Sequence, residues 1–311
     1  MSSRSFRASP PIPDEALERD ENLPDLDWAV PPSGSVRSTF LAPSGPLAAL
    51  AAGPPDGPRV VLVPGTSGSK EDFHFQFLEL AAAGYRAESY DLAGQYESRD
   101  AGPEHLSPPR RAYDYDLFTG DMVAFLEAGA TPAHLLGYSF AGVVAQLTAA
   151  SRPDLIASLT LLSTPPLAGQ VFRGVRWLGP LSLVSPGAVV AALMKTGILA
   201  NMQGVRPGRL RFVRDRFRLT RPEAFRKSLS LMRHTPDLRM QLRAAPFPIA
   251  VAVGTRDLWP LRLHRAFARS VGASIAVYRT GHSPCETAPY QLTRDLFALF
   301  EKAERSRDRG G

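Results

Sequence analysis

Cysteine is almost absent from this sequence, because Cys285 is the only one among 311 residues. A single cysteine excludes an intramolecular disulfide and any metal site built from several cysteines. The six histidines are scattered without metal-ligand spacing such as His-Glu-x-x-His, so we expect no metal site and surface or packing roles for most of them. Cys285 itself is expected to be a small buried residue rather than a nucleophile.

A secretory leader is also missing from the sequence as given, since no basic stretch precedes an apolar run at its start. A cytoplasmic location is therefore expected. The longest uncharged run, 177–194, has 18 residues, but two glycines and two prolines interrupt it. Proline costs a helix interior about 3 kcal/mol, so a short apolar hairpin is expected there rather than a membrane span.

Lysine is scarce, since it supplies four of the 36 basic residues and arginine the other 32. The segment 165–245 holds 15 basic and 3 acidic residues, a net charge of +12. The rest of the chain holds 21 basic and 27 acidic residues, a net charge of −6. All of the excess positive charge therefore belongs to one internal segment.

That basic segment is interpreted first as a solvated helix face. Arg211, Arg214 and Arg218 follow at i, i+3 and i+7, while Phe212 and Phe217 can point inward. A weak contact with an anionic surface or anionic substrate is the alternative. The segment carries no recognition motif for nucleic acid, so no nucleic-acid partner is expected.

Short apolar runs alternate with longer stretches of helical period from Val36 onward, which is typical of parallel βα units. We expect strands at 36–42, 46–52, 59–64, 85–90, 133–137, 158–162, 248–253 and 274–279. Helices are expected at 72–84, 113–128, 140–151, 260–271 and 287–303. The predicted organisation is an N-terminal Pro-rich tail or strap (1–34), the first part of the core (35–164), a helical insertion (165–245), and the second part of the core with a short basic C-terminal tail (246–311).

The sharpest motif is the run Gly137-Tyr-Ser139-Phe-Ala141-Gly142, which follows an apolar strand and opens a helix. A serine on such a sharp turn has an exposed hydroxyl, and small residues beside it let the backbone turn tightly. Alanine at 141 stands where glycine is usual, and it is small enough to keep this geometry. Ser139 is therefore the candidate nucleophile.

An acid and a histidine follow two later strands, at Asp257 and His282. A serine hydroxyl needs an imidazole to accept its proton, and the imidazole needs a carboxylate to orient it. The chain order Ser, Asp, His is that of strand-borne nucleophile elbows. Ser163-Thr164-Pro165, after an earlier strand, offers no acid and so favours Asp257.

A glycine-rich turn, Pro64 to Ser69, follows the strand at 59–64. Acyl transfer develops negative charge on a carbonyl oxygen, and two aimed backbone N–H groups stabilise it by several kcal/mol, on the order of 3. The N–H groups of Thr66 and Phe140 are the candidates. An ordinary glycine-rich loop is the alternative, and a phosphate loop fails because the Gly-x4-Gly frame before Lys70 is missing.

With these motifs the chain resembles the α/β-hydrolase superfamily over roughly residues 36–304. The resemblance implies a mostly parallel eight-stranded sheet with helices on both faces and a helical cap at 165–245. It also implies Ser139 as nucleophile, Asp257 as acid, His282 as base, and Thr66 and Phe140 as the oxyanion hole. The chain departs from the family pattern at Pro64, Tyr96 and Ala141, where the family often has His, Gly and Gly.

The expected function is a cofactor-free serine hydrolase that cleaves an ester, thioester or related acyl bond through an acyl-serine intermediate. A serine nucleophile argues against haloalkane-dehalogenase and epoxide-hydrolase chemistry, because the enzymes of the superfamily that catalyse those reactions use Asp as the nucleophile. The apolar stretch 177–202 suggests an apolar small-molecule substrate. The pocket candidates are Gly65, Tyr138, His74 and Tyr96. A non-catalytic ligand-binding protein and a perhydrolase or C–C hydrolase are the alternatives, and the oligomeric state is left open.

Overall fold

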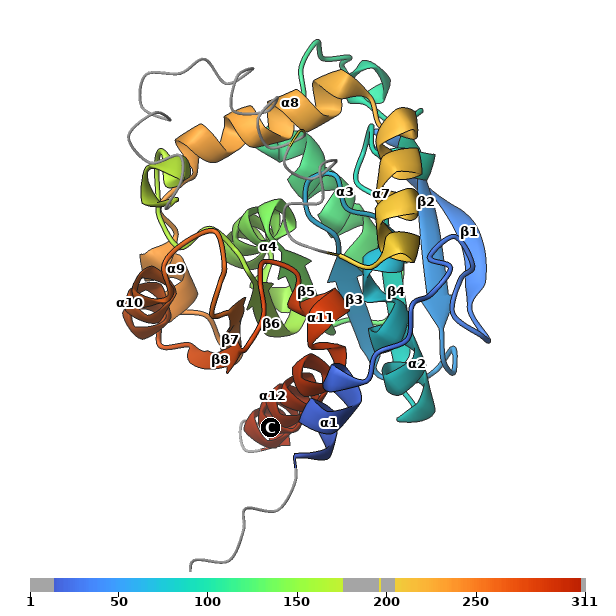
Figure 1. Ribbon diagram of the computed structural model, residues 1–311. Coiled ribbons are helices and arrows are strands. Elements are labelled where there is room, and N and C mark those ends of the chain that lie inside the picture. The colour runs from blue at the N-terminus through green and yellow to red at the C-terminus, as the bar shows by residue number, and fades with distance from the viewer. Residues whose placement is uncertain (1–13, 176–195, 197–204, 309–311) are drawn as a thin grey trace, which may run out of the picture.

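One eight-stranded sheet forms the centre of the molecule in the computed structural model, which describes residues 14–175, 196 and 205–308 (Figure 1). The strand order along the sheet is β1-β2-β4-β3-β5-β6-β7-β8. β2 runs antiparallel to both of its neighbours, and every other pair is parallel. The strands are β1 (Val36–Ala42), β2 (Gly45–Ala52), β3 (Arg59–Val63), β4 (Arg86–Tyr90), β5 (Ala133–Tyr138), β6 (Ile156–Leu162), β7 (Ile249–Gly254) and β8 (Ser274–Tyr278).

Helices cover both faces of this sheet because its central strands are apolar on both sides. Val60 and Leu62 of β3 belong to one hydrophobic cluster, while Val61 and Val63 belong to the other. The helices are α1 (Glu15–Glu21), α2 (His74–Ala82), α3 (Tyr115–Glu127), α4 (Phe140–Ser151), α7 (Pro207–Leu219), α8 (Pro222–Leu231), α9 (Arg239–Arg243), α10 (Leu261–Val271), α11 (Pro284–Thr287) and α12 (Pro289–Asp308).

The helices on one face of the sheet pack with one hydrophobic cluster, and those on the other face pack with the second. Helices α2 and α12 pack with the cluster that contains Leu62, and helices α3 and α4 pack with the cluster that contains Val61. The predicted mostly parallel sheet with helices on both faces is therefore confirmed. Each predicted strand and core helix is present, with ends that differ by a few residues.

The N-terminal segment contains a helix that the sequence pattern did not indicate. Helix α1 is capped by the Asp14 side chain and lies beside α12 (Figure 1). Its Asp20 accepts hydrogen bonds from the backbone N–H groups of Tyr290 and Gln291, at 2.8 and 3.1 Å. Farther along, Trp28 is buried against Phe75 and His74. The contacts of Asp20 span 270 and 271 residues, and those of Trp28 also join segments far apart in the sequence, so local periodicity does not reveal them.

Helices α7, α8 and α9 lie in the chain between β6 and β7, within the predicted helical insertion. On α7, Phe212 and Phe217 are buried while Arg211, Arg214 and Arg218 are exposed, as the spacing predicted. The uncharged run 177–194 lies outside the described residues. Among the helices that the structure describes, none is long and apolar enough to cross a membrane.

Candidate active site

Ser139 lies on a strained turn between β5 and α4. Its backbone has φ 53° and ψ −115°, outside the regions that L-residues prefer. The surrounding structure enforces this conformation through close packing, because a Cβ at Gly142 would lie 1.9 Å from Thr164 Oγ1. The small residues of the motif therefore let α4 begin directly against the end of β6, with Ser139 at the apex of the turn.

The loops after β7 and β8 are joined by their backbones, and this pairing brings the acid to the histidine. Thr255 N–H donates to Tyr278 O at 2.8 Å, and Arg256 N–H donates to Thr280 O at 2.9 Å. Gly254 faces Gly281 so closely that a Cβ there would lie 2.0 Å from the Gly281 carbonyl oxygen. The glycine before the acid loop is thus required by the loop that carries His282.

A chain of hydrogen bonds links the three residues. His282 Nε2 lies 3.1 Å from Ser139 Oγ, and His282 Nδ1 lies 2.6 Å from Asp257 Oδ2. Serine and carboxylate therefore approach opposite nitrogens of one imidazole, which is the geometry that moves a proton from a hydroxyl to a histidine. The His282 side chain keeps 11% of its surface exposed, whereas that of Asp257 is fully buried.

Asp257 stays ionised in this environment. Burial opposes its charge, but His282 and a second histidine, His264, outweigh burial and hold the pKa of Asp257 well below its ordinary value. His264 Nε2 lies 3.0 Å from Asp257 Oδ1, and Trp259 N–H donates to the same oxygen at 3.0 Å. His264 is fully buried, as the expectation of a surface or packing role allows, but its hydrogen bond to Asp257 was not anticipated.

The glycine-rich turn after β3 lies against the serine. A Cβ at Gly65 would lie 3.0 Å from Ser139 Cβ. Phe140 is the first residue of α4, so its N–H has no partner within the helix. In the part of the chain that the structure describes, the N–H of Thr66 donates no hydrogen bond and its buried hydroxyl oxygen has no partner. Both N–H groups are therefore available to a ligand.

The remaining pocket candidates divide into two groups. Tyr138 is buried beside the histidine loop, where its hydroxyl lies 2.7 Å from Ser283 Oγ and its ring 5.4 Å from that of His282. His74 instead contacts Trp28, and burial lowers the pKa of its imidazole. Tyr96 packs on Phe212. Among the described residues, no hydrogen bond or ring contact joins His74 or Tyr96 to Ser139, Asp257 or His282.

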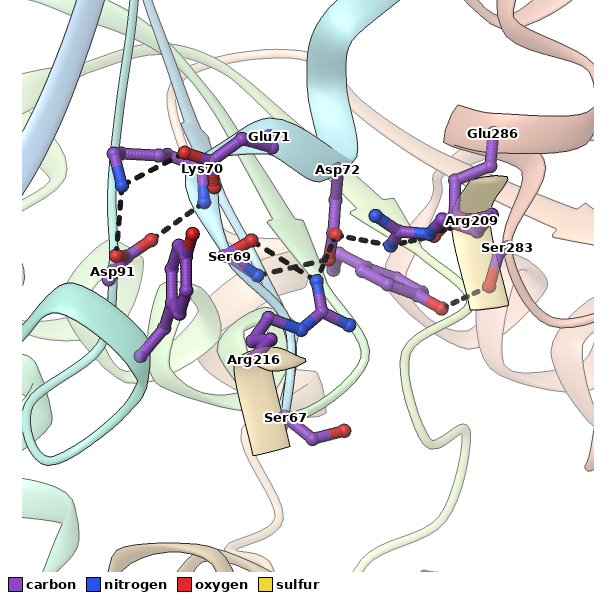
Figure 2. Close-up of polar contacts among 12 residues, drawn as sticks. Ser67, Ser69, Lys70, Glu71, Asp72, Asp91, Arg209, Arg216, Ser283 and Glu286 are labelled. Atoms are coloured by element: carbon purple, nitrogen blue, oxygen red, sulfur yellow. Dashed lines mark hydrogen bonds and ion pairs between the residues drawn. The ribbon is translucent and has the colours of Figure 1, made fainter. Parts of the chain in front are cut away.

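A buried ion network joins α7 to the turn after β3 and to α11, which follows the histidine loop (Figure 2). Asp72, in the short 3-10 helix Lys70–Phe73 after the glycine-rich turn, accepts hydrogen bonds from Arg209 at 2.5 Å and Arg216 at 2.6 Å. Arg209 also binds both carboxylate oxygens of Glu286 on α11, at 2.8 and 2.6 Å. Burial opposes the charge of Asp72, but the two arginines outweigh it and lower the pKa of this carboxyl.

Sequence reasoning missed this network, although a signal for it exists. Arg209 and Arg216 are seven residues apart and bracket the buried Phe212 and Val213, so all four share the inward stripe of α7. Two arginines on an apolar stripe indicate buried partners of opposite charge. Part of the positive charge of the segment 165–245 is therefore neutralised by buried carboxylates.

Lys70 forms a second buried group beside the first (Figure 2). Its Nζ lies 3.0–3.1 Å from Glu71 and Asp91 and 2.6 Å from Glu97. Burial raises the pKa of Asp91 to about 7, although Lys70 opposes that shift. Asp91 thus supports the turn that follows β3, because its carboxylate accepts hydrogen bonds from the backbone N–H and the Nζ of Lys70, at 2.8 and 3.1 Å. Likewise, burial raises the pKa of the Cys285 thiol, so it stays protonated and is a poor nucleophile.

The family model described as "Alpha/beta hydrolase family" matches residues 60–296 of this chain. A Variovorax paradoxus protein whose name describes a carbamate hydrolase, RutD, is 35% identical over 115 residues, which cover 36% of this chain and 40% of that protein. Epoxide hydrolase B of Mycobacterium tuberculosis is 33% identical over 130 residues, covering 41% of this chain and 35% of that protein. The chain thus aligns with less than half the length of these relatives.

Solved structures match much more of the chain at lower identity. The enol-lactonase from Burkholderia xenovorans LB400 superposes with a TM-score of 0.67 at 20% identity, covering 85% of this chain and 100% of that one. A thermophilic esterase from Thermogutta terrifontis gives a TM-score of 0.66 at 22% identity, covering 86% and 99%. At these identities the likeness concerns the fold.

Proposed function

Because the chain belongs to the alpha/beta hydrolase family, we propose that it is a serine hydrolase that cleaves an ester, thioester or related acyl bond. One observation carries the proposal: His282 lies between Ser139 Oγ and Asp257, one nitrogen to each. A serine that is present only for folding does not need an imidazole at 3.1 Å backed by a buried carboxylate.

Acylation follows from this arrangement. Ser139 Oγ attacks the carbonyl carbon of the substrate while His282 Nε2 takes the hydroxyl proton. Asp257 holds the imidazole in the tautomer whose Nδ1 carries a proton, and it stabilises the imidazolium that forms. The N–H groups of Thr66 and Phe140 bind the oxyanion, and His282 then gives its proton to the leaving alcohol or thiol.

Deacylation reverses these roles. His282 Nε2 takes a proton from water, and the resulting oxygen nucleophile attacks the carbonyl of acyl-Ser139. The second oxyanion collapses, the proton on His282 returns to Ser139 Oγ, and the carboxylic acid leaves. The reacting atoms are balanced by substrate and water alone, so the proposal needs no cofactor.

The serine nucleophile also distinguishes the proposed chemistry of this chain from epoxide hydrolysis. Epoxide hydrolase B is 33% identical over its matched segment, but the elbow of this chain carries the hydroxyl of Ser139. A serine hydroxyl that shares its proton with His282 suits acyl transfer. The proposed substrate is therefore an acyl compound rather than an epoxide.

A panel of p-nitrophenyl esters and acyl thioesters of increasing chain length tests the proposal. Wild-type protein should turn over at least one member, and Ser139→Ala and His282→Ala should each lower kcat by at least about a thousandfold without unfolding the chain. Turnover that persists in Ser139→Ala would reject the acyl-serine route. A folded wild type that binds panel members without turning them over would instead be a ligand-binding protein.

Contact with an anionic surface is a separate proposal for the exposed arginines of α7, such as Arg211 and Arg218. Arg218 already pairs with Asp215, which weakens this proposal. Binding to vesicles with and without anionic lipid, at low and high salt, tests it. Electrostatic docking predicts binding only to anionic vesicles at low salt, and equal binding throughout rejects it.

A further inference from the structure

A second buried histidine lies on the far side of the carboxylate that orients His282. His264 Nε2 lies 3.0 Å from Asp257 Oδ1, while His282 Nδ1 lies 2.6 Å from Asp257 Oδ2. The His264 side chain is 1% exposed. The two carboxylate oxygens of Asp257 are thus each held by a different imidazole.

The helix explains how His264 reaches this position. Pro260 precedes α10, and His264 falls in the first turn of that helix. Long helical side chains point back toward the helix N-terminus, so the ring of His264 covers the loop that enters the helix. That loop contains Asp257. The seven-residue separation of the two residues is therefore a consequence of one loop turn followed by one helical turn.

Hydrogen-bond accounting assigns the tautomer. An ionised carboxylate only accepts, so the proton between the two groups belongs to His264 Nε2. Among the described residues, His264 Nδ1 is buried and has no hydrogen-bond partner. A second proton on Nδ1 would be an unpaired buried donor, which costs about 1–3 kcal/mol. The neutral imidazole with its proton on Nε2 fits the site best.

This donor restrains a carboxylate that would otherwise rotate. The terminal torsion of an aspartate is broad, and the Trp259 N–H holds Asp257 at the same single oxygen, Oδ1, at 3.0 Å. A donor on α10 and a donor on the backbone approach Oδ1 from different elements, so together they fix the carboxylate plane. Oδ2 is then aimed at His282.

We propose that His264 is a positioning residue, whose Nε2–H fixes the plane of the Asp257 carboxylate and so keeps His282 aligned with Ser139. This inference rests on the proposed serine-hydrolase function. The same contact also contributes to the lowered pKa of Asp257, because a hydrogen bond to the ionised form favours it. Core packing alone requires only the volume of the ring, whereas positioning requires its N–H.

The variants separate these two roles. His264→Gln keeps an N–H donor at a similar reach, and His264→Leu removes it at similar volume. His134→Leu is the matched control, because His134 is also buried and bonds Ser158 Oγ at 2.8 Å, but at the other end of β5 from Ser139. Kinetics on a p-nitrophenyl ester that wild type hydrolyses should show kcat lowered about tenfold to a hundredfold in His264→Leu with KM unchanged, and largely recovered in His264→Gln.

A spectroscopic readout keeps the test independent of turnover. The proton shared by His282 Nδ1 and Asp257 should give a strongly deshielded line in the proton NMR spectrum. His264→Leu should shift or broaden that line, while His264→Gln and His134→Leu should retain it. Should His264→Leu not fold, His264→Asn, whose amide is too short to reach Asp257, should show the same loss.

The opposite results are equally clear. Wild-type kcat and an unchanged line in the folded donor-less variant overturn the positioning role. A loss in His134→Leu as large as that in His264→Leu assigns the effect to packing and also overturns it. A wild-type protein that hydrolyses no panel member contradicts the proposed function, and the NMR line still decides the role of His264.

Discussion

Arg209 on α7 and Glu286 on α11 form a buried ion pair with two hydrogen bonds. Glu286 lies four residues after His282 in the sequence. Arg209 Nε lies 2.8 Å from Glu286 Oε2, and Arg209 Nη2 lies 2.6 Å from Oε1. The same guanidinium contacts Asp72 and lies over the ring of Trp28, with its carbon 4.4 Å from the ring centroid. One arginine thus ties the N-terminal strap, the turn after β3 and the histidine loop to α7.

Replacing that arginine should destabilise the protein strongly. Arg209→Leu leaves Asp72 and Glu286 buried with too little positive charge, and loss of one partner from a buried ion pair costs about 3–5 kcal/mol. Urea unfolding should show a loss of this size in the free energy of unfolding. Arg209→Lys should recover only part of it, because an ammonium group cannot make the two-point contact.

Arg211→Leu is the control for this prediction, since Arg211 is an exposed residue of the same helix. Its free energy of unfolding should stay within about 0.5 kcal/mol of wild type. Equal effects of Arg209→Leu and Arg211→Leu would show that the buried network contributes no specific stability.

The strands of the sheet could be predicted from the sequence because the signals for them are local. Each strand is a short apolar run, and each loop after β5, β7 and β8 carries a recognisable motif at its start. Contacts such as that of Arg209 with Asp72, 137 residues apart, depend on how the layers meet. The docking of Trp28 escaped prediction for the same reason. The contact between His264 and Asp257 spans only seven residues, but a lone buried side chain leaves no periodic pattern.

Two glycines in helices should respond to alanine in opposite ways. At Gly142 a Cβ would lie 1.9 Å from Thr164 Oγ1 and 2.7 Å from its Cγ2, so Gly142→Ala forces α4 away from β6. The expected loss is about 1–3 kcal/mol in the free energy of unfolding. Gly120 in α3 has no atom within 4 Å of such a Cβ, so Gly120→Ala should raise it by about 0.5–1 kcal/mol.

Thermal or urea unfolding of both glycine variants provides the measurement. Because Gly142 lies three residues after Ser139, Gly142→Ala should also slow the reaction of that serine with an active-site probe, while Gly120→Ala should not. If Gly142→Ala is as stable as wild type, the packing that we assign to the elbow is wrong.

Asp121 should make stability depend on pH in an unusual direction. It is buried, and burial raises its pKa from the ordinary 3.8 to about 7, although hydrogen bonds from Ser44 oppose that shift. Between these two values the folded protein holds a proton that the unfolded chain has released. This contribution to stability is therefore present at low pH and is lost as pH rises to about 7, by at most about 1.4 kcal/mol per unit.

Asp121→Asn should remove this dependence, because an amide keeps an acceptor and a donor for Ser44 without a titrating proton. Relative to wild type, its free energy of unfolding should increase between pH 5 and pH 8 on the order of a few kcal/mol. Asp116→Asn, at an exposed position of the same helix, should follow the wild-type profile. Parallel profiles of wild type and Asp121→Asn would contradict the assigned pKa.

The most direct test of the central claim is covalent labelling by a fluorophosphonate, with the modified residue identified by mass spectrometry. We predict one label per chain in the wild-type protein, on Ser139, with no label on folded Ser139→Ala and strongly slowed labelling of His282→Ala. Folded wild-type protein that takes no label, or that takes it at a serine other than Ser139, would contradict the account.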